Sequence, residues 1–241
     1  RRRDPGSRIV DLSGLQAGTR LSGWKLVREL GRGAFGVTWA AEDENGRLAA
    51  VKILKEAPGA ELRALARLHH PAVVSVLCGG TSPYHHIVME LVPGRPLTHF
   101  LRSGPAPEPI ALGVISVLAD ALASIHQARL THADLKPDNV LVESIREPKL
   151  KLVDFGLAGT QRGGTLSYAA PERLQGQPST PEADCYSLGM VLWEMVHGAL
   201  PWPELDRSEA LLRRTHTSPA PSRGSPLVCE LLTGLLQLDP A

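Results

Sequence analysis

The chain has 241 residues, of which 43% are hydrophobic, and its 26 Lys and Arg residues nearly balance its 25 Asp and Glu residues, giving a formal net charge of +1. This length and apolar content are enough to bury the core of one large domain or of two small lobes. The balanced charge argues against binding to nucleic acid or to a membrane surface through overall charge, so we expect neither partner.

The first third of the chain is predicted to form strands. Residues 1–20 are rich in Arg, Gly, Ser and Asp, and we expect a flexible arm, part of which can pack. The runs "WKLVREL", "GVTWAAED" and "RLAAVKIL" follow, with a hairpin signal at Asn45-Gly46. Leucines at 62, 65 and 68 predict a short helix that ends at Pro71. "AVVSVLCGG" and "HHIVMELV" predict two more strands, which end at Pro93-Gly94.

The rest of the chain is predicted to be mainly helical. Three segments carry apolar residues at helical spacing: 110, 114, 115, 118, 119, 122 and 125; then 188, 191, 192, 195 and 196; then 227, 228, 231, 232, 235 and 236. Residues 217–226 read as a Pro/Ser loop. We therefore predict an arm at 1–20 and two lobes, 21–92 and 93–241.

Other features predict neither disulfides nor a metal cluster nor a membrane span. Cys78, Cys185 and Cys229 are odd in number, widely spaced and flanked by apolar residues, as expected for buried thiols in a reducing compartment. The apolar stretch from Cys185 to Trp193 is far shorter than the roughly 20 residues that cross a bilayer. Without an initiator methionine or a signal peptide, the chain is expected to be a cytoplasmic fragment or processed product, whose full-length form could be membrane-anchored elsewhere.

Gly31, Gly33 and Gly36 form a G-x-G-x-x-G pattern between the first two strands. Dinucleotide-binding folds and ordinary turns share this spacing. In a dinucleotide fold a helix would follow the third glycine, whereas here "VTWAAE" is strand-like. A glycine-rich turn between two strands can lie over phosphates, because backbone N–H groups approach the oxygens closely where no Cβ intervenes.

Lys52 lies in the apolar strand "AAVKIL", where an ammonium group is costly unless an anion meets it. A nucleotide phosphate and a carboxylate would both serve. Glu61, in the predicted short helix, is the candidate carboxylate, although a solvated glutamate at a helix start is an equally ordinary reading.

The segment "THADLKPDNV" (131–140) and the strand end "KLVDFG" (151–156) lie a hairpin's length apart. Magnesium takes hard oxygen ligands, one or two carboxylates together with substrate phosphates. The sequence therefore predicts that Asn139 and Asp154 bind a metal ion together.

Taken in order, "GRGAFGV", "AVK", the Glu61 helix, "HADLKPDN", "DFG", "YAAPE" and "DCYSLG" resemble the eukaryotic-type (Hanks-type) protein kinase catalytic domain over about residues 19–241. Arginine-rich, asparagine-poor usage and the stretch "GTRLSGWKLVRELGRGAFG" resemble bacterial members. The resemblance implies an α+β bilobal fold, with a β-sheet N-lobe carrying one short helix and a mainly helical C-lobe that is truncated at its end.

The resemblance also implies roles for individual residues. ATP would be bound by Gly31, Gly33, Gly36, Val37, Ala50, Lys52, Glu90, Val92 and Leu141, with Glu61 holding Lys52 and Met89 as gatekeeper. Asn139 and Asp154 would hold Mg²⁺, or Mn²⁺ in its place. Asp134 would accept the proton of the substrate hydroxyl, and Lys136 would neutralise charge on the γ-phosphoryl group.

"DLKPDN" and "GTLSYAAPE" are similar to Ser/Thr rather than tyrosine kinases, so the implied acceptor is a serine or threonine of a protein substrate. Ala133 stands where the family often has an arginine that receives an activation-loop phosphate. We therefore expect activity without prior phosphorylation of Thr160 or Thr165. The chain also ends before the arginine that usually pairs with the glutamate of "APE", here Glu172.

Two other classes remain open. A pseudokinase would bind nucleotide or act as a scaffold without phosphoryl transfer, yet every catalytic position is filled here. A small-molecule kinase would share the Asp, Asn and "DFG"-like ligands, but the "APE" segment and Thr165 resemble a peptide-docking platform.

Overall fold

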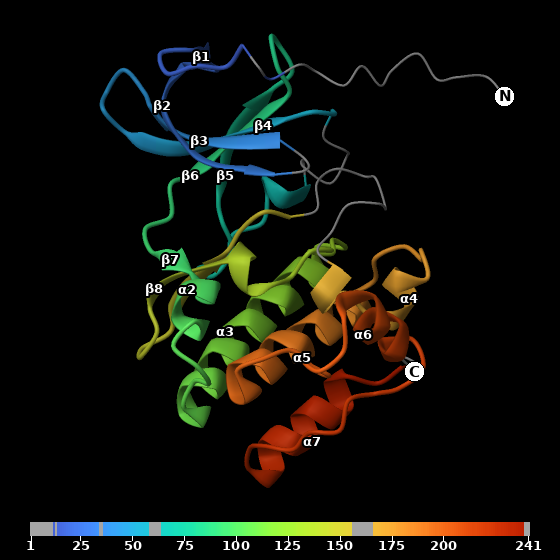
Figure 1. Cartoon of the computed structure of the whole chain (residues 1–241). Helices are drawn as coiled ribbons and strands as arrows, with labels where there is room; N and C mark the ends of the chain where they lie inside the picture. The colour runs from blue at the N-terminus through green and yellow to red at the C-terminus, as the bar shows by residue number, and fades with distance from the viewer. Residues whose placement is uncertain (1–11, 13, 34–35, 58–63, 156–165, 239–241) are drawn as a thin grey trace, which may run out of the picture. The chain divides into compact units, whose positions relative to one another are not determined.

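The computed structural model describes residues 12, 14–33, 36–57, 64–155 and 166–238. The chain divides into two compact units (Figure 1). Of the described residues, the first unit contains those up to 69 and 74–92, and the second contains 70–73, 93–155 and 166–238. Each unit is described by itself below.

The first unit is built on one antiparallel sheet of six strands, in the order β1-β2-β3-β4-β6-β5. Its strands are β1 (Arg20–Leu21), β2 (Trp24–Gly33), β3 (Gly36–Glu42), β4 (Leu48–Leu54), β5 (Val76–Gly80) and β6 (His86–Glu90). Of the predicted short helix, residues 58–63 lie outside the described residues, and Ala64 and Leu65 are helical.

The hairpin predicted at Asn45-Gly46 is confirmed. The N–H of Asp43 donates to the carbonyl of Arg47 at 3.0 Å, which closes the loop between β3 and β4. The Asp43 carboxylate accepts from the backbone N–H groups of Asn45 and Arg47, both at 2.9 Å. Gly46 has φ +77°, a conformation that costs glycine little.

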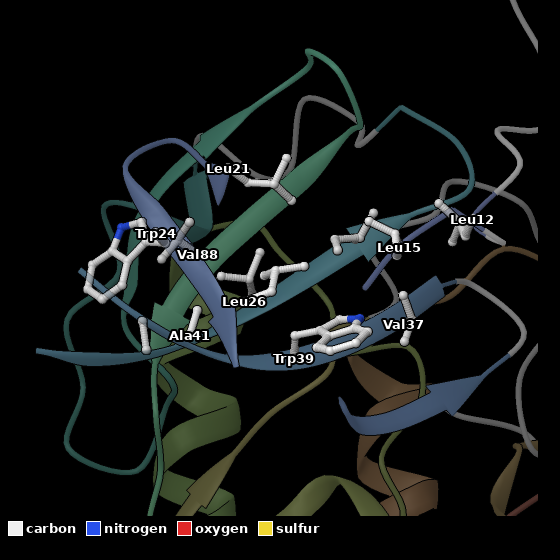
Figure 2. Packing of buried hydrophobic residues seen from close by; sticks show 12 residues of the cluster. Leu12, Leu15, Leu21, Trp24, Leu26, Val37, Trp39, Ala41 and Val88 are labelled. Carbon is white, nitrogen blue, oxygen red and sulfur yellow. The ribbon is translucent and has the colours of Figure 1, made fainter. Parts of the chain in front are cut away.

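One face of this sheet carries the hydrophobic core of the first unit (Figure 2). Side chains alternate between the two faces of a strand, so every second residue of β3 points into this cluster. The buried members are Leu12, Leu15, Leu21, Trp24, Leu26, Val37, Trp39, Ala41, Ala49, Val51, Ile53 and Val88.

The end of the predicted N-terminal arm is part of this core. Leu12 and Leu15 are 5% and 9% exposed and pack near Val37 and Trp39 (Figure 2). Gly18 donates its N–H to the carbonyl of Leu26, and Leu26 donates to Thr19, both at 2.8 Å. The stretch from Gly14 to Arg20 is therefore tied to β2, and burial of the two leucines offsets the entropy of ordering it. Residues 1–11 lie outside the described residues.

The predicted strand at 72–80 is shorter than expected. Only Val76–Gly80 joins the sheet, whereas Val73 forms a parallel bridge with Leu152 in the second unit. The N–H of Leu152 donates to the carbonyl of Ala72 at 2.8 Å. The first part of the predicted strand therefore forms its backbone hydrogen bond with β9 and not with the six-stranded sheet.

The second unit contains a three-stranded antiparallel sheet and a set of helices (Figure 1). The sheet has β8 (Val140–Ser144) at its centre, between β7 (Arg95–Pro96) and β9 (Lys149–Leu152). The helices are α2 (Leu97–Leu101), α3 (Glu108–Gln127), α4 (Pro171–Leu174), α5 (Pro181–His197), α6 (Arg207–Arg214) and α7 (Pro226–Leu235), with short 3₁₀ turns η1 (Pro137–Asn139) and η2 (Leu166–Tyr168).

Helix α5 contacts both α3 and α7 (Figure 1). The buried apolar faces of the three helices make the core of this unit. The face predicted for α5 is buried throughout. On α3 the buried face includes Ala111 and Ala121 in place of residues 110 and 119. On α7, Val228 and Leu232 are buried but Leu227 is 54% exposed.

Helix α3 is long and apolar enough, by length and composition, to cross a membrane, with a mean hydropathy of 1.7 over an 18-residue window. The apolar stretch named from the sequence, Cys185 to Trp193, lies in α5 instead. The packing of α3 accounts for its composition, since seven of its residues are buried inside the unit, among them Val114 and Leu118. Its Asp120 contacts the His70 ring at 3.0 Å.

Candidate active site

The loop from Thr131 to Lys136 is fixed by one buried carboxylate. Asp184, on the first turn of α5, is 1% exposed and accepts the backbone N–H groups of His132 at 2.7 Å and Ala133 at 2.9 Å. The His126 ring nitrogen Nε2 lies 3.0 Å from the same carboxylate. Hydrogen bonds from N–H groups to a charged acceptor are strong, so Asp184 sets the backbone path immediately before Asp134.

Asp134, Lys136 and Asn139 meet in this loop, as the sequence predicts. The Nζ of Lys136 donates to Oδ2 of Asp134 at 2.7 Å. The side-chain amide of Asn139 donates to the carbonyl of Asp134 at 2.8 Å and to its Oδ2 at 3.1 Å. The side-chain nitrogen of Asn139 therefore donates both of its hydrogen bonds to Asp134. The side-chain oxygen of Asn139 is the atom that can bind a cation.

Asp154 is brought to the same place by the β8–β9 hairpin. Asn139 immediately precedes β8, and Asp154 follows the end of β9, whose Leu152 pairs with Val140. The N–H of Val153 donates to the carbonyl of Asn139 at 2.9 Å, which holds the two chain segments together next to Asp154. Asp154 has φ +58°, which is uncommon for a residue other than glycine. Gly156 of the "DFG" motif lies outside the described residues.

His132 contacts residues on both sides of this arrangement, Asp134 and Val153. It is fully buried, its Nε2 lies 3.0 Å from the carbonyl of Val153, and its ring packs on Phe155 with centroids 4.8 Å apart. Its Nδ1 faces the N–H of Asp134 at 3.4 Å, so the neutral form protonated on Nε2 fits both neighbours. Burial lowers the pKa of His132, although the nearby carboxylates, Asp184 first, act in the opposite direction.

In the first unit, Lys52, Ala50 and Met89 share one face of the sheet. Lys52 is 8% exposed on β4, and Ala50 pairs with Met89 of β6. Thr38 pairs with Lys52 across the β3–β4 ladder, so it points to the same face.

Val37 points to the other face. It pairs with Ile53 and is 1% exposed in the hydrophobic cluster with Trp39 (Figure 2). The prediction that Val37 contacts nucleotide therefore conflicts with its placement, because side chains one residue apart on a strand point in opposite directions. Thr38, which the sequence analysis did not single out, lies beside Lys52 instead.

Glu90 and Val92 end the first unit. The N–H of Glu90 donates to the carbonyl of Ser75 at 3.0 Å, and its carboxylate accepts the N–H of Ser75 at 2.7 Å. Both the backbone N–H and the carboxylate of Glu90 are therefore bonded to Ser75. Leu141, in the second unit, alternates along β8 with the buried Val140 and Val142 and faces the other side of its sheet.

The three glycines have different surroundings. A Cβ on Gly36 would collide with the carbonyl oxygen of Ile53, so the sheet itself requires glycine there. A Cβ on Gly31 or Gly33 would meet nothing within 4 Å in the part of the protein that the structure describes. Glu61, Thr160 and Thr165 lie outside the described residues, so their predicted roles stay predictions.

The segment before α4 is held by a residue that the sequence analysis left without a role. The hydroxyl of Tyr168 donates to Oε2 of Glu194 on α5 at 2.6 Å. Burial raises the pKa of Tyr168, and the bond to Glu194 acts in the same direction. Burial also raises the pKa of Glu194. The "YAAPE" spacing could have indicated Tyr168, but only the fold shows its partner.

Comparison with known proteins assigns the family. The family model described as "Protein kinase domain" matches residues 24–241. The serine/threonine-protein kinase PknA of Mycobacterium tuberculosis is 37% identical over 216 residues, which are 78% of this chain and 50% of that protein. Pkn2 of Myxococcus xanthus, also a serine/threonine-protein kinase, is 33% identical over 242 residues, 89% of this chain and 29% of the relative. PknE of M. tuberculosis is 35% identical over 208 residues, 77% and 36% of the two chains.

The chain thus spans half of the length of PknA, and less of pkn2 and PknE. The match covers the second unit, the first unit from Trp24 onward, and the kinase motifs from "GRGAFGV" to "DCYSLG". The family and the α+β fold class predicted from the sequence are confirmed, and the named relatives are bacterial. The chain belongs to the protein kinase domain family, which uses ATP and a divalent metal ion.

Proposed function

We propose that this chain is the catalytic domain of a serine/threonine protein kinase, which transfers the γ-phosphoryl group of ATP to protein hydroxyls. The observation that carries the proposal is the cluster of Asp134, Lys136 and Asn139, with Asp154 held beside it through the Val153–Asn139 hydrogen bond. Phosphoryl transfer needs little covalent chemistry from the protein, so positioned charges of this kind supply most of the catalysis.

Asp134 is assigned as the group that orients the substrate hydroxyl and accepts its proton. Its side chain is 15% exposed, so it is reachable while being fixed by Lys136 and Asn139. The hydroxyl oxygen forms a bond to the γ-phosphorus, the bond from that phosphorus to the bridging oxygen breaks, and the electron pair leaves with ADP. Lys136, paired with Asp134, would also neutralise charge on the transferred group.

The donor set suits magnesium. Asn139 offers an amide oxygen and Asp154 a carboxylate, both hard oxygen ligands, and substrate phosphates would complete the coordination. Mn²⁺ would be accepted by the same ligands. When bound, the ion would neutralise phosphate charge; the residues of this chain hold and orient the reactants. No group of three or more His, Cys, Asp or Glu residues suited to a metal occurs in the described part of the chain.

ATP recognition is assigned to residues of the first unit. Lys52, held by Glu61, would bind the α and β phosphates, and Gly31 and Gly33 leave room for phosphate oxygens next to their backbone. Ala50, Thr38 and the backbone of Glu90 and Val92 would meet the nucleoside. Val37 is left out because it lies in the core cluster of the first unit.

The serine or threonine acceptor is supported by the names of the relatives, which are serine/threonine-protein kinases. The "DLKPDN" and "GTLSYAAPE" segments point the same way. We also propose that the domain works in the cytoplasm, where ATP and reduced thiols coincide; Cys78, Cys185 and Cys229 are free.

The proposal is tested by ³²P transfer from ATP with Mg²⁺ to a panel of serine, threonine and tyrosine peptides. Asp134→Asn should lower kcat by about 10²- to 10⁴-fold, the usual contribution of a general base, with ATP binding retained. Asp138→Asn is the matched control, since Asp138 lies in the same loop but is exposed and bonds only to Thr98 among its described side-chain contacts, at 3.2 Å. This control should stay within about threefold of wild type, as expected for an exposed surface site.

Three outcomes would contradict the proposal. ATP binding by the full-length protein without transfer to any acceptor would favour a nucleotide-binding scaffold. Transfer dominated by tyrosine would overturn the acceptor assignment. An equal effect of the two substitutions would remove Asp134 from the reaction.

A further inference from the structure

Arg214 is the one arginine that is buried among the residues the structure describes. It lies at the end of α6, and only 2% of its surface is exposed. Arginine is rarely buried without a charged partner, because the guanidinium group loses its water. Among the described residues no carboxylate lies within ion-pair distance of Arg214.

The contacts of Arg214 are backbone carbonyls of the segment before α4. Its Nη1 donates to the carbonyl of Leu166 at 3.1 Å and to the carbonyl of Ala169 at 3.4 Å. The same Leu166 carbonyl accepts the N–H of Ala169 at 3.1 Å, which closes the turn η2. One guanidinium nitrogen therefore bridges both ends of this turn.

Two tyrosines also lie near the guanidinium group of Arg214. Tyr168 and Tyr186 both interact electrostatically with Arg214, and burial lowers the pKa of the guanidinium. The Nε of Arg214 and the hydroxyl of Tyr186 are buried and have no hydrogen-bond partner among the described residues. Both groups lose hydration without full compensation, so the arrangement costs stability.

The turn is thus held from two helices. Tyr168 in its middle is bonded to Glu194 of α5, and the carbonyls at its ends are bonded to Arg214 of α6. The "APE" motif follows the turn: Ala170 immediately precedes α4, and Pro171 and Glu172 are its first two residues. We propose that Arg214 is a positioning residue, which holds the Leu166–Ala169 turn in the shape that receives the acceptor peptide.

This inference rests on the proposed kinase activity. It adds Arg214 to the residues that act in recognition of the acceptor peptide. It also separates two explanations of the buried charge. If Arg214 served stability alone, its loss would lower stability and impair every activity together. Since buried ionic groups are often replaced by apolar residues of similar volume without loss of stability, we expect an effect on peptide recognition instead.

The test compares Arg214→Met with Arg213→Met and Arg214→Lys. Arg213 is the matched control, because it is the exposed neighbour, its guanidinium lies 5.4 Å over the Trp202 ring, and none of its side-chain bonds reaches the turn. Arg214→Met should raise the peptide KM about tenfold, the size expected for one or two hydrogen bonds to a charged group. The KM for ATP and the unfolding temperature should be unchanged, and Arg214→Lys, which keeps a donor, should recover part of the loss.

Hydrogen exchange gives a readout that does not depend on activity. In Arg214→Met the backbone N–H of Ala169, which is bonded to Leu166, should exchange faster, whereas the N–H groups of His132 and Ala133 should keep their protection. The control variant should match wild type throughout.

An unchanged peptide KM in Arg214→Met, or unchanged exchange at Ala169, would overturn the proposal. If Arg214→Met fails to fold, the same two measurements on Arg214→Lys decide. If the wild-type protein transfers no phosphate, the proposed function fails, while hydrogen exchange still shows whether Arg214 holds the turn.

Discussion

Replacing Asp184 by asparagine changes one atom of the group that fixes the catalytic loop. The side chain keeps its shape, so no cavity forms, but the charge is lost and one oxygen becomes an N–H₂ group. In the protein, Oδ2 accepts from His132 and lies beside His126, while Oδ1 accepts from Ala133. The amide oxygen is therefore expected to take the Oδ2 position, which leaves the N–H₂ group facing the N–H of Ala133.

The cost follows from these contacts. One buried donor loses its acceptor, at about 1–3 kcal/mol, and the remaining hydrogen bonds are no longer charge-assisted. We expect a total loss of about 3 kcal/mol in the free energy of unfolding. For a chain of this size each kcal/mol lowers the unfolding temperature by about 2–4 °C, so the shift should be about 6–12 °C.

Thermal unfolding and steady-state kinetics measure this directly, with Asp120→Asn as the matched control. Asp120 is also on a helix of the second unit and also contacts a histidine, but its side chain is 78% exposed. The control should stay within about 0.5 kcal/mol of wild type. Below the unfolding temperature, Asp184→Asn should lower kcat by up to about 10²-fold, because the backbone before Asp134 shifts. Equal unfolding temperatures for the two variants would refute this account of the loop.

Two further predictions concern stability. Leu15→Ala should lower the free energy of unfolding by about 2 kcal/mol, because Leu15 is buried in the first-unit core. Leu48→Ala is the control and should have little effect, because Leu48 is 60% exposed. If denaturant titration gave equal effects for the two variants, the N-terminal stretch would not pack. Burial lowers the pKa of His132, so below the ordinary pKa of 6.5 the unfolded chain binds a proton that the folded chain does not. Stability should therefore be highest above pH 6.5 and fall as the pH drops, with a slope of at most about 1.4 kcal/mol per pH unit from this group. His132→Asn should remove that part of the slope, and an unchanged slope would contradict the assignment.

The sequence predicted the candidate site well where its residues lie close along the chain. Asp134, Lys136 and Asn139 are within six residues, and the β8–β9 hairpin brings Asp154 back to Asn139. Local spacing brings the first three side chains together, and the hairpin returns the backbone next to Asp154 to Asn139.

Sequence reasoning was less reliable where an argument depended on which face of a strand a residue occupies. A shift of one residue separates Val37, in the core, from Thr38, beside Lys52. Both residues read as strand formers, so the choice required the β3–β4 register.

Helix α6 and Arg214 were not predicted at all. The helix has only eight residues, too few for a helical period of apolar residues to stand out in the sequence. Its start nevertheless carries a capping box in which Asp206 and Glu209 satisfy each other's backbone N–H groups. That signal could have located the helix. Burial of Arg214 could not have been inferred, since it depends on contacts with a segment 45 and 48 residues away in the chain.

The packing of Leu12 and Leu15 bears on where the folded domain starts. The family match begins at Trp24, which would be the obvious first residue for expressing the domain. A protein started there would lack Leu12, Leu15 and Leu21 and would leave Val37 and Trp39 uncovered. Such a patch of exposed apolar side chains favours aggregation. Expression should therefore begin ahead of Leu12, at least twelve residues before the boundary that sequence similarity suggests.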